Sequence, residues 1–279
     1  MSSAYRSQSF GFGATWTPAV KVLIIINGAI FVLQELVRLP LSHLLGLVPY
    51  AVIFKGWAWQ LVTYMFLHGG LMHVGFNMLA LWMFGSQLER VWGTREFLRY
   101  YFITGIGAGI INIAFSPTSP IPTIGASGAI FGLLLAYGVL FPNNLILLYF
   151  FIPIKAKYFV ILFAAIEFIM SRSYTSDGVA HFAHLGGMAV GLLYLKGSPL
   201  VRRSVWRLSK KSRMQKEARQ VKMEAQRMTD LQAIRSEVDY LLDRINKVGY
   251  ENLTAEEKER LEQASQQLRV YSEERQDLN

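Results

Sequence analysis

The chain has 279 residues and no cysteine, which excludes disulfides, thiol catalysis and cysteine-ligated metal. Charged residues are also scarce, at 17% of the chain, whereas a soluble domain of this size has about 25%. Acidic side chains are rarest before residue 196, where they are limited to Glu35, Glu89, Glu96, Glu167 and Asp177. An aspartyl intramembrane protease needs two aspartates within its spans, so that class of enzyme is excluded as well.

Hydrophobic residues make up 52% of the chain, the mean hydropathy is positive, and the composition changes near residue 195. A helical span needs about 20 apolar residues, fewer inside a bundle. The predicted fold is all-α, a membrane bundle of six transmembrane helices over residues 19–195, after a cytoplasmic segment at residues 1–18. The expected spans are Ala19–Val37, Leu71–Leu88, Phe97–Phe115, Ala126–Phe141, Tyr158–Met170 and His181–Leu195. The fifth is short, and the apolar stretch Leu145–Pro153 offers it an earlier start.

The residues after 195 are polar and highly charged. Between Lys196 and Met228 there are eleven Lys or Arg and two Glu, which predicts a basic juxtamembrane segment at residues 196–226. Such a cluster is expected to lie in the cytoplasm on anionic lipid headgroups, so the net charge of +9 does not indicate nucleic-acid binding. Residues 227–279 are predicted to form a small helical hairpin. Its first helix is amphipathic over Arg227–Lys247, and its second starts at Thr254 with Glu257 as a capping-box partner.

Loop charges predict the orientation of the bundle. An even number of spans puts both termini on one side, and the basic tail and the pairs Arg90/Arg95 and Lys155/Lys157 favour the cytoplasm for that side. The loop Ser116–Ile124 carries no charge and is expected outside, with the start of the fourth span. The polar N-terminus, with no small-residue cleavage site after the first apolar run, predicts a retained span. The Trp- and Tyr-rich connection Pro40–Gly70 suits the headgroup level.

Ser127 is the first candidate for chemistry. It lies in Gly125-Ala126-Ser127-Gly128, after a proline-rich loop and at the start of an apolar helix. Gly125 permits a tight entry and Gly128 keeps bulk away from the hydroxyl, while the helix start offers backbone N–H groups and a positive dipole end to a developing oxyanion. The alternative is that these small residues only pack membrane helices.

His184 is the second candidate, in Ala-His-Leu-Gly-Gly. With Gly187 and Gly191 it occupies positions i, i+3 and i+7, so the three share a face on which a GxxxG pair allows close helix approach. An imidazole there could take the proton of a serine on span four. The alternatives are a histidine that only links helices, or a metal site of His181 and His184 with His68 or His73. The sequence has no HExxH motif, and no carboxylate is expected beside these histidines because Glu89 falls near the opposite membrane face, so no metal is expected.

His73 and Asn77 form the third element. They are one helical turn apart in the second span, shortly after His68, and therefore share a face. Neither is acidic, so they suit hydrogen-bond donation to an oxyanion better than proton abstraction. The alternative is a polar patch that ties this span to its neighbours.

Together these residues resemble the rhomboid family over about Trp16–Leu195. The motifs occur in the family's order: His68, then His73 and Asn77, then GASG, then AHLGG. Glu89 also resembles a family position at the cytoplasmic end of span two that ties helices together. One departure is visible, because Trp59 is followed by Gln60 where the family often has arginine.

The resemblance implies a Ser–His dyad without an acidic third member, in which Ser127 attacks and His184 acts as base and then acid. The Ser127 amide, His73 and Asn77 would form the oxyanion hole, and Phe131 would stack on the histidine. It implies no cofactor, an inner-membrane location in a bacterium, and substrates that are single-span proteins. The rival readings are a catalytically silent rhomboid-like chaperone or scaffold and a small-solute transporter. A transporter would be expected to have internal repeats or interrupted helices in paired positions, and the sequence shows no convincing repeat. The sequence assigns no oligomeric state.

Overall fold

The computed structural model describes residues 16–37, 41–148, 151–172 and 180–276. The chain divides into two compact units after Leu208, and each is described by itself. The expected cytoplasmic segment at residues 1–18 falls almost entirely outside the described residues, as does Asp177.

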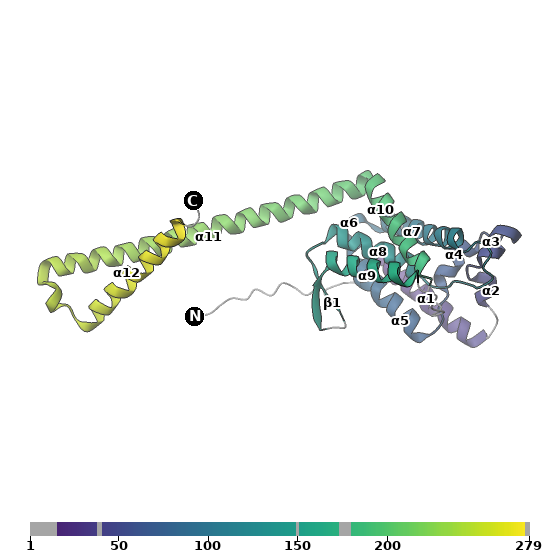
Figure 1. Cartoon of the computed structure of the whole chain (residues 1–279), viewed down its shortest axis with the longest axis horizontal. Coiled ribbons are helices and arrows are strands. Elements are labelled where there is room, and N and C mark those ends of the chain that lie inside the picture. Colours follow the sequence, from purple (N-terminus) through teal and green to yellow (C-terminus); the bar gives the residue numbers. More distant parts are fainter. Residues whose placement is uncertain (1–15, 38–40, 149–150, 173–179, 277–279) are drawn as a thin grey trace. The chain divides into compact units, whose positions relative to one another are not determined.

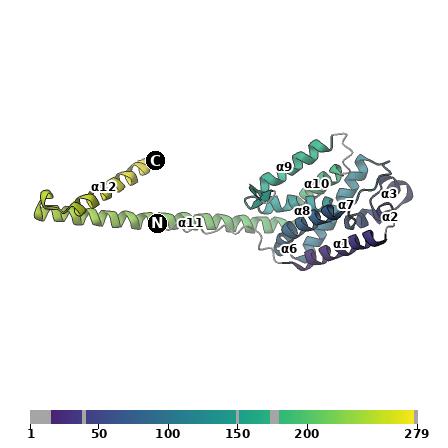
Figure 2. The same ribbon diagram turned by 90° about the horizontal axis from the view of Figure 1, so that it is seen from below.

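The first unit is a helical bundle (Figure 1). Its longer helices are α1 (Pro18–Val37), α5 (Leu71–Ala80), α7 (Thr94–Phe115), α8 (Ser127–Leu140), α9 (Ala156–Met170) and α10 (His181–Gly197). Helix α8 is apolar on all sides and packs against α7, α9 and α10, which lie around it in Figure 2. A helix without a polar face is expected in the interior of a bundle, and α8 is largely buried.

These helices match the expected spans to within a few residues at each end. The second span alone is composite, because α5 continues through a π-helical turn, η2 (Leu81–Gly85), into α6 (Ser86–Trp92). Among the described residues, two helical stretches are long and apolar enough by themselves to cross a membrane, namely Pro18–Leu36 and Thr94–Phe115, and α8 is apolar but shorter.

The earlier start for the fifth span is wrong. Residues 145–148 and 152–155 pair as antiparallel strands, β1 (Leu145–Leu148) and β2 (Ile152–Lys155), with Leu145 paired to Lys155 and Leu148 to Ile152. A short apolar run bounded by turn residues suits a strand as well as a helix, and here Pro153 cannot supply an amide to a helix interior. Helix α9 therefore begins at Ala156.

The connection between α1 and α5 contains short helices: α2 (Leu41–Leu45), α3 (Pro49–Lys55), α4 (Gln60–Thr63) and the 3-10 turn η1 (Tyr64–Phe66). Gln60, which stands where arginine is common, anchors this segment. Its buried amide accepts from the Val48 N–H at 3.0 Å and donates to the His43 carbonyl at 3.0 Å. A neutral side chain that bonds main-chain groups on both sides thus holds this connection together without a charge.

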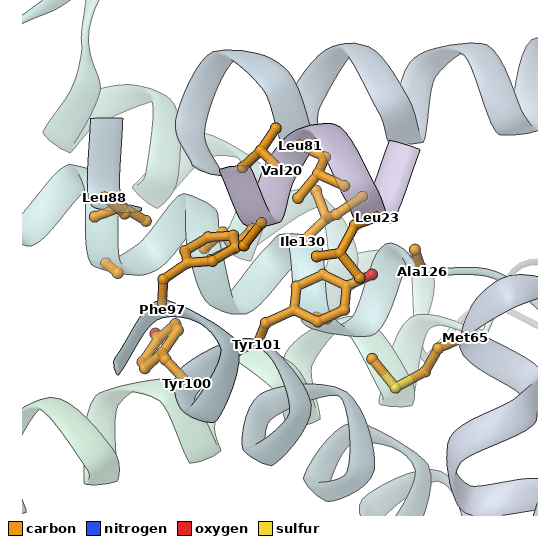
Figure 3. Close-up of a cluster of buried hydrophobic side chains, with 14 of the residues drawn as sticks. Val20, Leu23, Met65, Leu81, Leu88, Phe97, Tyr100, Tyr101, Ala126 and Ile130 are labelled. Carbon is orange, nitrogen blue, oxygen red and sulfur yellow. The ribbon is translucent and has the colours of Figure 1, made fainter. Parts of the chain in front are cut away.

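The core of the first unit combines aromatic side chains of α7 with aliphatic ones of its neighbours (Figure 3). Phe97, Tyr100 and Tyr101 of α7 are fully buried among apolar side chains of α1, α5, η2 and α8. The Tyr100 hydroxyl donates to the Gly132 carbonyl of α8 at 2.7 Å, so a buried polar tip is satisfied where the two helices meet.

The second unit contains the remainder of α11 (Pro199–Val248), the turn η3 (Tyr250–Asn252) and α12 (Ala255–Gln276). The predicted capping box is confirmed: the Thr254 N–H donates to Glu257 at 2.9 Å, and the Glu257 N–H donates to the Thr254 hydroxyl at 3.2 Å. That backbone donor, followed by Arg244, holds the pKa of Glu257 below its usual range. Helix α11 has no break at residues 226–227, where the basic segment was expected to give way to a separate amphipathic helix.

Candidate active site

Ser127 is the first residue of α8, and the loop before it is fixed at two points. Thr123 exchanges two backbone hydrogen bonds of 2.8 Å with Leu47, and the Gly125 N–H donates to the Tyr64 carbonyl at 2.9 Å. Gly125 has φ +126°, a conformation that favours glycine. The connection between α1 and α5 therefore sets the position from which the serine projects.

His184 of α10 lies against this serine. Its Nε2 is 2.8 Å from the Ser127 Oγ, and the imidazole is buried. For the hydroxyl to donate to the ring, Nε2 must be unprotonated, which places the proton of the neutral ring on Nδ1. The pair has the distance and the orientation that a general base needs.

Phe131 lies one turn after Ser127 on α8 and stacks on the imidazole. The ring centroids of Phe131 and His184 are 4.3 Å apart and the planes differ by 10°. Phe163 of α9 packs behind Phe131 at 6.4 Å. The plane of the imidazole is therefore fixed by an aromatic face, as the resemblance implied.

The small residues of α8 and α10 let the two helices approach closely. A side chain at Gly187 would run into the carbonyl of Gly128, and one at Gly191 would run into the Tyr100 hydroxyl and approach Gly132. A side chain at Gly128 would also lie 2.7 Å from Ala108. Hence the glycines bring His184 within reach of Ser127.

His73 of α5 faces the same loop. A Cβ at Gly125 would lie 2.8 Å from His73 Nε2, so glycine is required there by the histidine as well as by the backbone. His73 Nδ1 accepts from the Gly69 N–H at 3.3 Å, which leaves the proton of the neutral ring on Nε2, the atom nearest the serine loop. His73 is thus arranged as a donor beside Ser127.

Asn77 and His68 flank His73. The buried Asn77 amide donates one N–H to the His73 carbonyl at 2.8 Å and has a second to offer. The buried His68 ring meets the edge of His73 at a centroid distance of 5.1 Å, and its backbone accepts from and donates to Gln34 of α1. His68 thus packs against His73, and it can support the orientation of that ring.

Glu167 of α9 was not among the candidate residues, and the expectation that no carboxylate lies beside the histidines is wrong. Glu167 Oε1 is 3.0 Å from His184 Nδ1, and Oε2 is 2.6 Å from His181 Nδ1. The carboxylate is buried. Two facts of the sequence pointed to it: acidic residues are rare before residue 196, and an ionisable residue within a span is a functional candidate by default.

Glu167, His181 and His184 place one ligand atom each within 4.8 Å of one another. Two imidazoles and a carboxylate form a donor set that zinc enzymes use. In this site, however, each carboxylate oxygen already contacts a histidine, and the far nitrogen of His184 contacts Ser127. The absence of a metal stays a prediction.

Glu89 lies in α6 and belongs to a different contact. Its carboxylate accepts from the Ala19 and Val20 N–H groups at 2.9 and 3.1 Å and from the Thr94 hydroxyl at 2.6 Å. A carboxylate on the first amides of α1 is favoured by the helix dipole. It links the starts of α1 and α7 to the end of the second span.

Fold and site together define a class: a helical bundle of apolar helices with a serine–histidine pair at the start of a buried helix. Comparison with known proteins identifies the family within this class. Residues 55–197 match the Rhomboid domain, and the chain belongs to the rhomboid family. It is therefore an integral membrane protein of a family that includes intramembrane serine proteases, and its described helices form a membrane bundle.

Several curated proteins are similar to it. Rhomboid protein 1, mitochondrial, of Saccharomyces cerevisiae is 34% identical over 140 residues, which cover 46% of this chain and 38% of that protein. Rhomboid protease GluP of Bacillus subtilis is 45% identical over 84 residues, covering 30% and 16%. YdcA of the same organism is 34% identical over 146 residues, covering 50% and 67%. The chain thus spans well under half the length of the first two.

The C-terminal part of the chain matches a different family. Residues 230–267, which contain the end of α11, η3 and most of α12, match a second family, described as one of unknown function.

Proposed function

We propose that this protein is an intramembrane serine endopeptidase in which Ser127 is the nucleophile and His184 the general base. The observation that carries the proposal is the 2.8 Å contact between His184 Nε2 and Ser127 Oγ at the first turn of a buried helix. A serine is a weak nucleophile until an adjacent base accepts its proton, and this geometry supplies one.

The reaction follows from the positions of the groups. Ser127 Oγ attacks the carbonyl carbon of the substrate peptide as its proton passes to His184 Nε2, and the carbonyl oxygen becomes an oxyanion. His73 Nε2–H and the second N–H of Asn77, with the Ser127 amide, donate to this oxygen. His184 then protonates the leaving amine, the C–N bond breaks, and an acyl-serine remains. Water, deprotonated by His184, attacks this ester. His184 then returns the proton to Ser127 Oγ as the C–O bond breaks, which releases the acid and the free serine.

The proposal includes an orientation. Six spans with both termini in the cytoplasm would have Ser127 near the outer surface. The loop before Ser127 is uncharged, and the balance of basic residues, above all the tail, favours the opposite side as the cytoplasmic one. Substrates are then single-span proteins with small or helix-breaking residues near that surface, since a helical carbonyl is hydrogen-bonded and covered. The basic segment at residues 196–226 lies on anionic headgroups.

A fluorophosphonate probe tests the nucleophile, because it forms a bond only with an activated serine. In detergent we expect labelling of the wild type, and none of Ser127→Ala or His184→Ala. His181→Ala should keep a good part of the labelling, since His181 does not contact Ser127. Equal labelling of wild type and Ser127→Ala would defeat the assignment.

A further inference from the structure

Among the residues that the structure describes, the buried carboxylate of Glu167 contacts two histidines. Its side chain is 9% exposed, and the His184 and His181 side chains are 10% and 12% exposed. An ionised carboxylate in the interior of a membrane bundle is costly unless positive charge or hydrogen-bond donors meet it. His181 meets one oxygen at 2.6 Å, and the other oxygen lies at the Nδ1 edge of His184.

The position of Glu167 relative to Ser127 is that of the acid in a catalytic triad. Ser127 contacts Nε2 of His184, and Glu167 contacts the opposite nitrogen of the same ring. In the ground state Nδ1 carries the proton, and after Ser127 gives up its own proton the ring is an imidazolium with its charge beside the carboxylate. The electrostatic attraction is therefore strongest in the transition state, which is the condition for faster chemistry.

We propose that Glu167 is a positioning residue for the proposed protease reaction, a third member that holds His184 by its Nδ1 edge and stabilises its imidazolium form. Glu167 stays ionised throughout, and no proton leaves His184 Nδ1. His181 holds the other carboxylate oxygen and so orients Glu167, giving the order Ser127, His184, Glu167, His181. This assignment rests on the proposed function and replaces the two-residue site that the resemblance implied.

The angle at His184 Nδ1 bears on the mechanism. The nitrogen is buried at 3.0 Å from Glu167, yet its N–H does not point along the line to the oxygen as a hydrogen bond requires. The contact in the resting structure is thus electrostatic. Catalytic hydrogen bonds often tighten only when the substrate binds, so the oblique angle is compatible with the role.

The pH dependence of the proposed reaction depends on the charged and titratable groups around His184. Glu167 approaches from α9, His181 lies one turn earlier on α10, and His73 of α5 is close enough to interact electrostatically. Helix α7 presents apolar groups here, with Ile111 and Ala108 against Gly186. Glu167 is the acidic group at this ring among the residues that the structure describes, so its removal should destabilise the imidazolium.

The test compares Glu167→Gln with wild type on a purified single-span substrate across pH. Glutamine keeps the shape and removes the charge. We expect kcat to fall about 10- to 100-fold with little change in KM. The acidic limb of the kcat profile should move to lower pH by about one unit or more, because His184 then loses its proton more readily. Glu167→Asp should restore part of kcat and keep the limb where the wild type has it.

Glu96→Gln is the matched control. Glu96 is a buried carboxylate of α7 that bonds Tyr194 and Arg99 and has no contact with the Ser127 site. Glu96→Gln should leave the acidic limb of the kcat profile at the wild-type pH, even if its thermal stability falls. Thermal unfolding in detergent tells lost folding from lost chemistry, and if Glu167→Gln does not fold, the aspartate variant carries the test.

Three results would overturn the role of Glu167. The first is a kcat for the glutamine variant within about twofold of wild type. The second is a lower kcat with the acidic limb unmoved, which would make Glu167 a purely structural residue. The third is loss of wild-type activity on chelation and its return with zinc, which would make the three side chains a metal site. If instead Ser127→Ala retains full activity, the proposed function itself fails, and this outcome is distinguishable because it does not involve Glu167.

Discussion

His184 is held on three sides by three residues from two neighbouring helices. Ser127 of α8 contacts one ring nitrogen, Glu167 of α9 lies at the other, and Phe131 covers a face at 4.3 Å. A stacked ring fixes the plane of the imidazole, and in the role proposed above the carboxylate restrains its Nδ1 edge, so the two constraints are complementary. With the aromatic ring alone, the His184 imidazole could still shift within its own plane.

Asn77 offers a prediction at this scale, because its free N–H matters only when an oxyanion is present. Asn77→Ala should lower kcat about 100-fold or more with little change in KM. The effect of His73→Ala should resemble that of Asn77→Ala more than that of Ser127→Ala. Steady-state cleavage of a single-span substrate gives both constants.

Asn27 provides the control for that prediction. It is a buried asparagine of α1 whose side chain donates to the carbonyl four residues earlier at 2.8 Å, as Asn77 does. Asn27→Ala should lower thermal stability and leave kcat per folded molecule unchanged. If both variants lose stability alone, Asn77 belongs to the fold and not to the oxyanion hole.

The sequence could indicate Ser127 and His184 because their motifs are local. Ser127 is flanked by glycines at a helix start, and His184 shares a face with Gly187 and Gly191. Glu167 could not be placed in the same way, since it lies on a different helix from His184 and nothing in the sequence says which face of α9 meets α10. That orientation depends on packing between helices, which is why only the rarity of acidic residues pointed to it.

At the scale of elements, the seam between α8 and α10 sets the distance from base to nucleophile. Gly187→Ala should push these helices apart, because its methyl group would meet the Gly128 carbonyl, a main-chain atom that cannot rotate away. We expect about 1–3 kcal/mol of destabilisation, as overpacking of a core costs, and reduced activity. Thermal unfolding in detergent measures the first effect and substrate cleavage the second.

Gly28→Ala in α1 is the matched change, since nothing lies within 4 Å of a Cβ placed there. It should raise stability by up to about 1 kcal/mol, as alanine does in place of glycine in a helix interior, and leave activity unchanged. If Gly187→Ala behaves in the same way, the close approach of α8 and α10 is not needed for the site.

Element boundaries followed from hydropathy wherever one helix accounts for one apolar run, as for α1 and α7. The boundaries predicted from hydropathy were wrong where an apolar run does not form one regular helix. Residues 145–148 and 152–155 pair with each other as strands, and η2 adds a π-helical turn inside an otherwise regular apolar segment. Neither feature changes the hydrophobic pattern, so a search for apolar runs cannot detect it.

At the scale of the whole molecule, the proposed orientation can be measured directly. The chain has no cysteine, so a single one introduced at Ser119, in the loop before Ser127, is a unique label. It should react with an impermeant thiol reagent added to the outside of intact cells, while a cysteine at Asn279 should react only after lysis. The reverse pattern would place Ser127 on the cytoplasmic side and remove the basis for choosing substrates that are cut near the outer surface.

The central claim is that Ser127 cuts peptide bonds within the membrane. The measurement that addresses it is cleavage of a purified single-span protein by the reconstituted chain in liposomes, with fragments identified by mass spectrometry. We expect the wild type to make one cut near the outer end of the substrate span, and Ser127→Ala, inserted and folded to the same extent, to make none. Fragments that persist in Ser127→Ala, or a folded wild type that binds the substrate and leaves it whole, would contradict the claim.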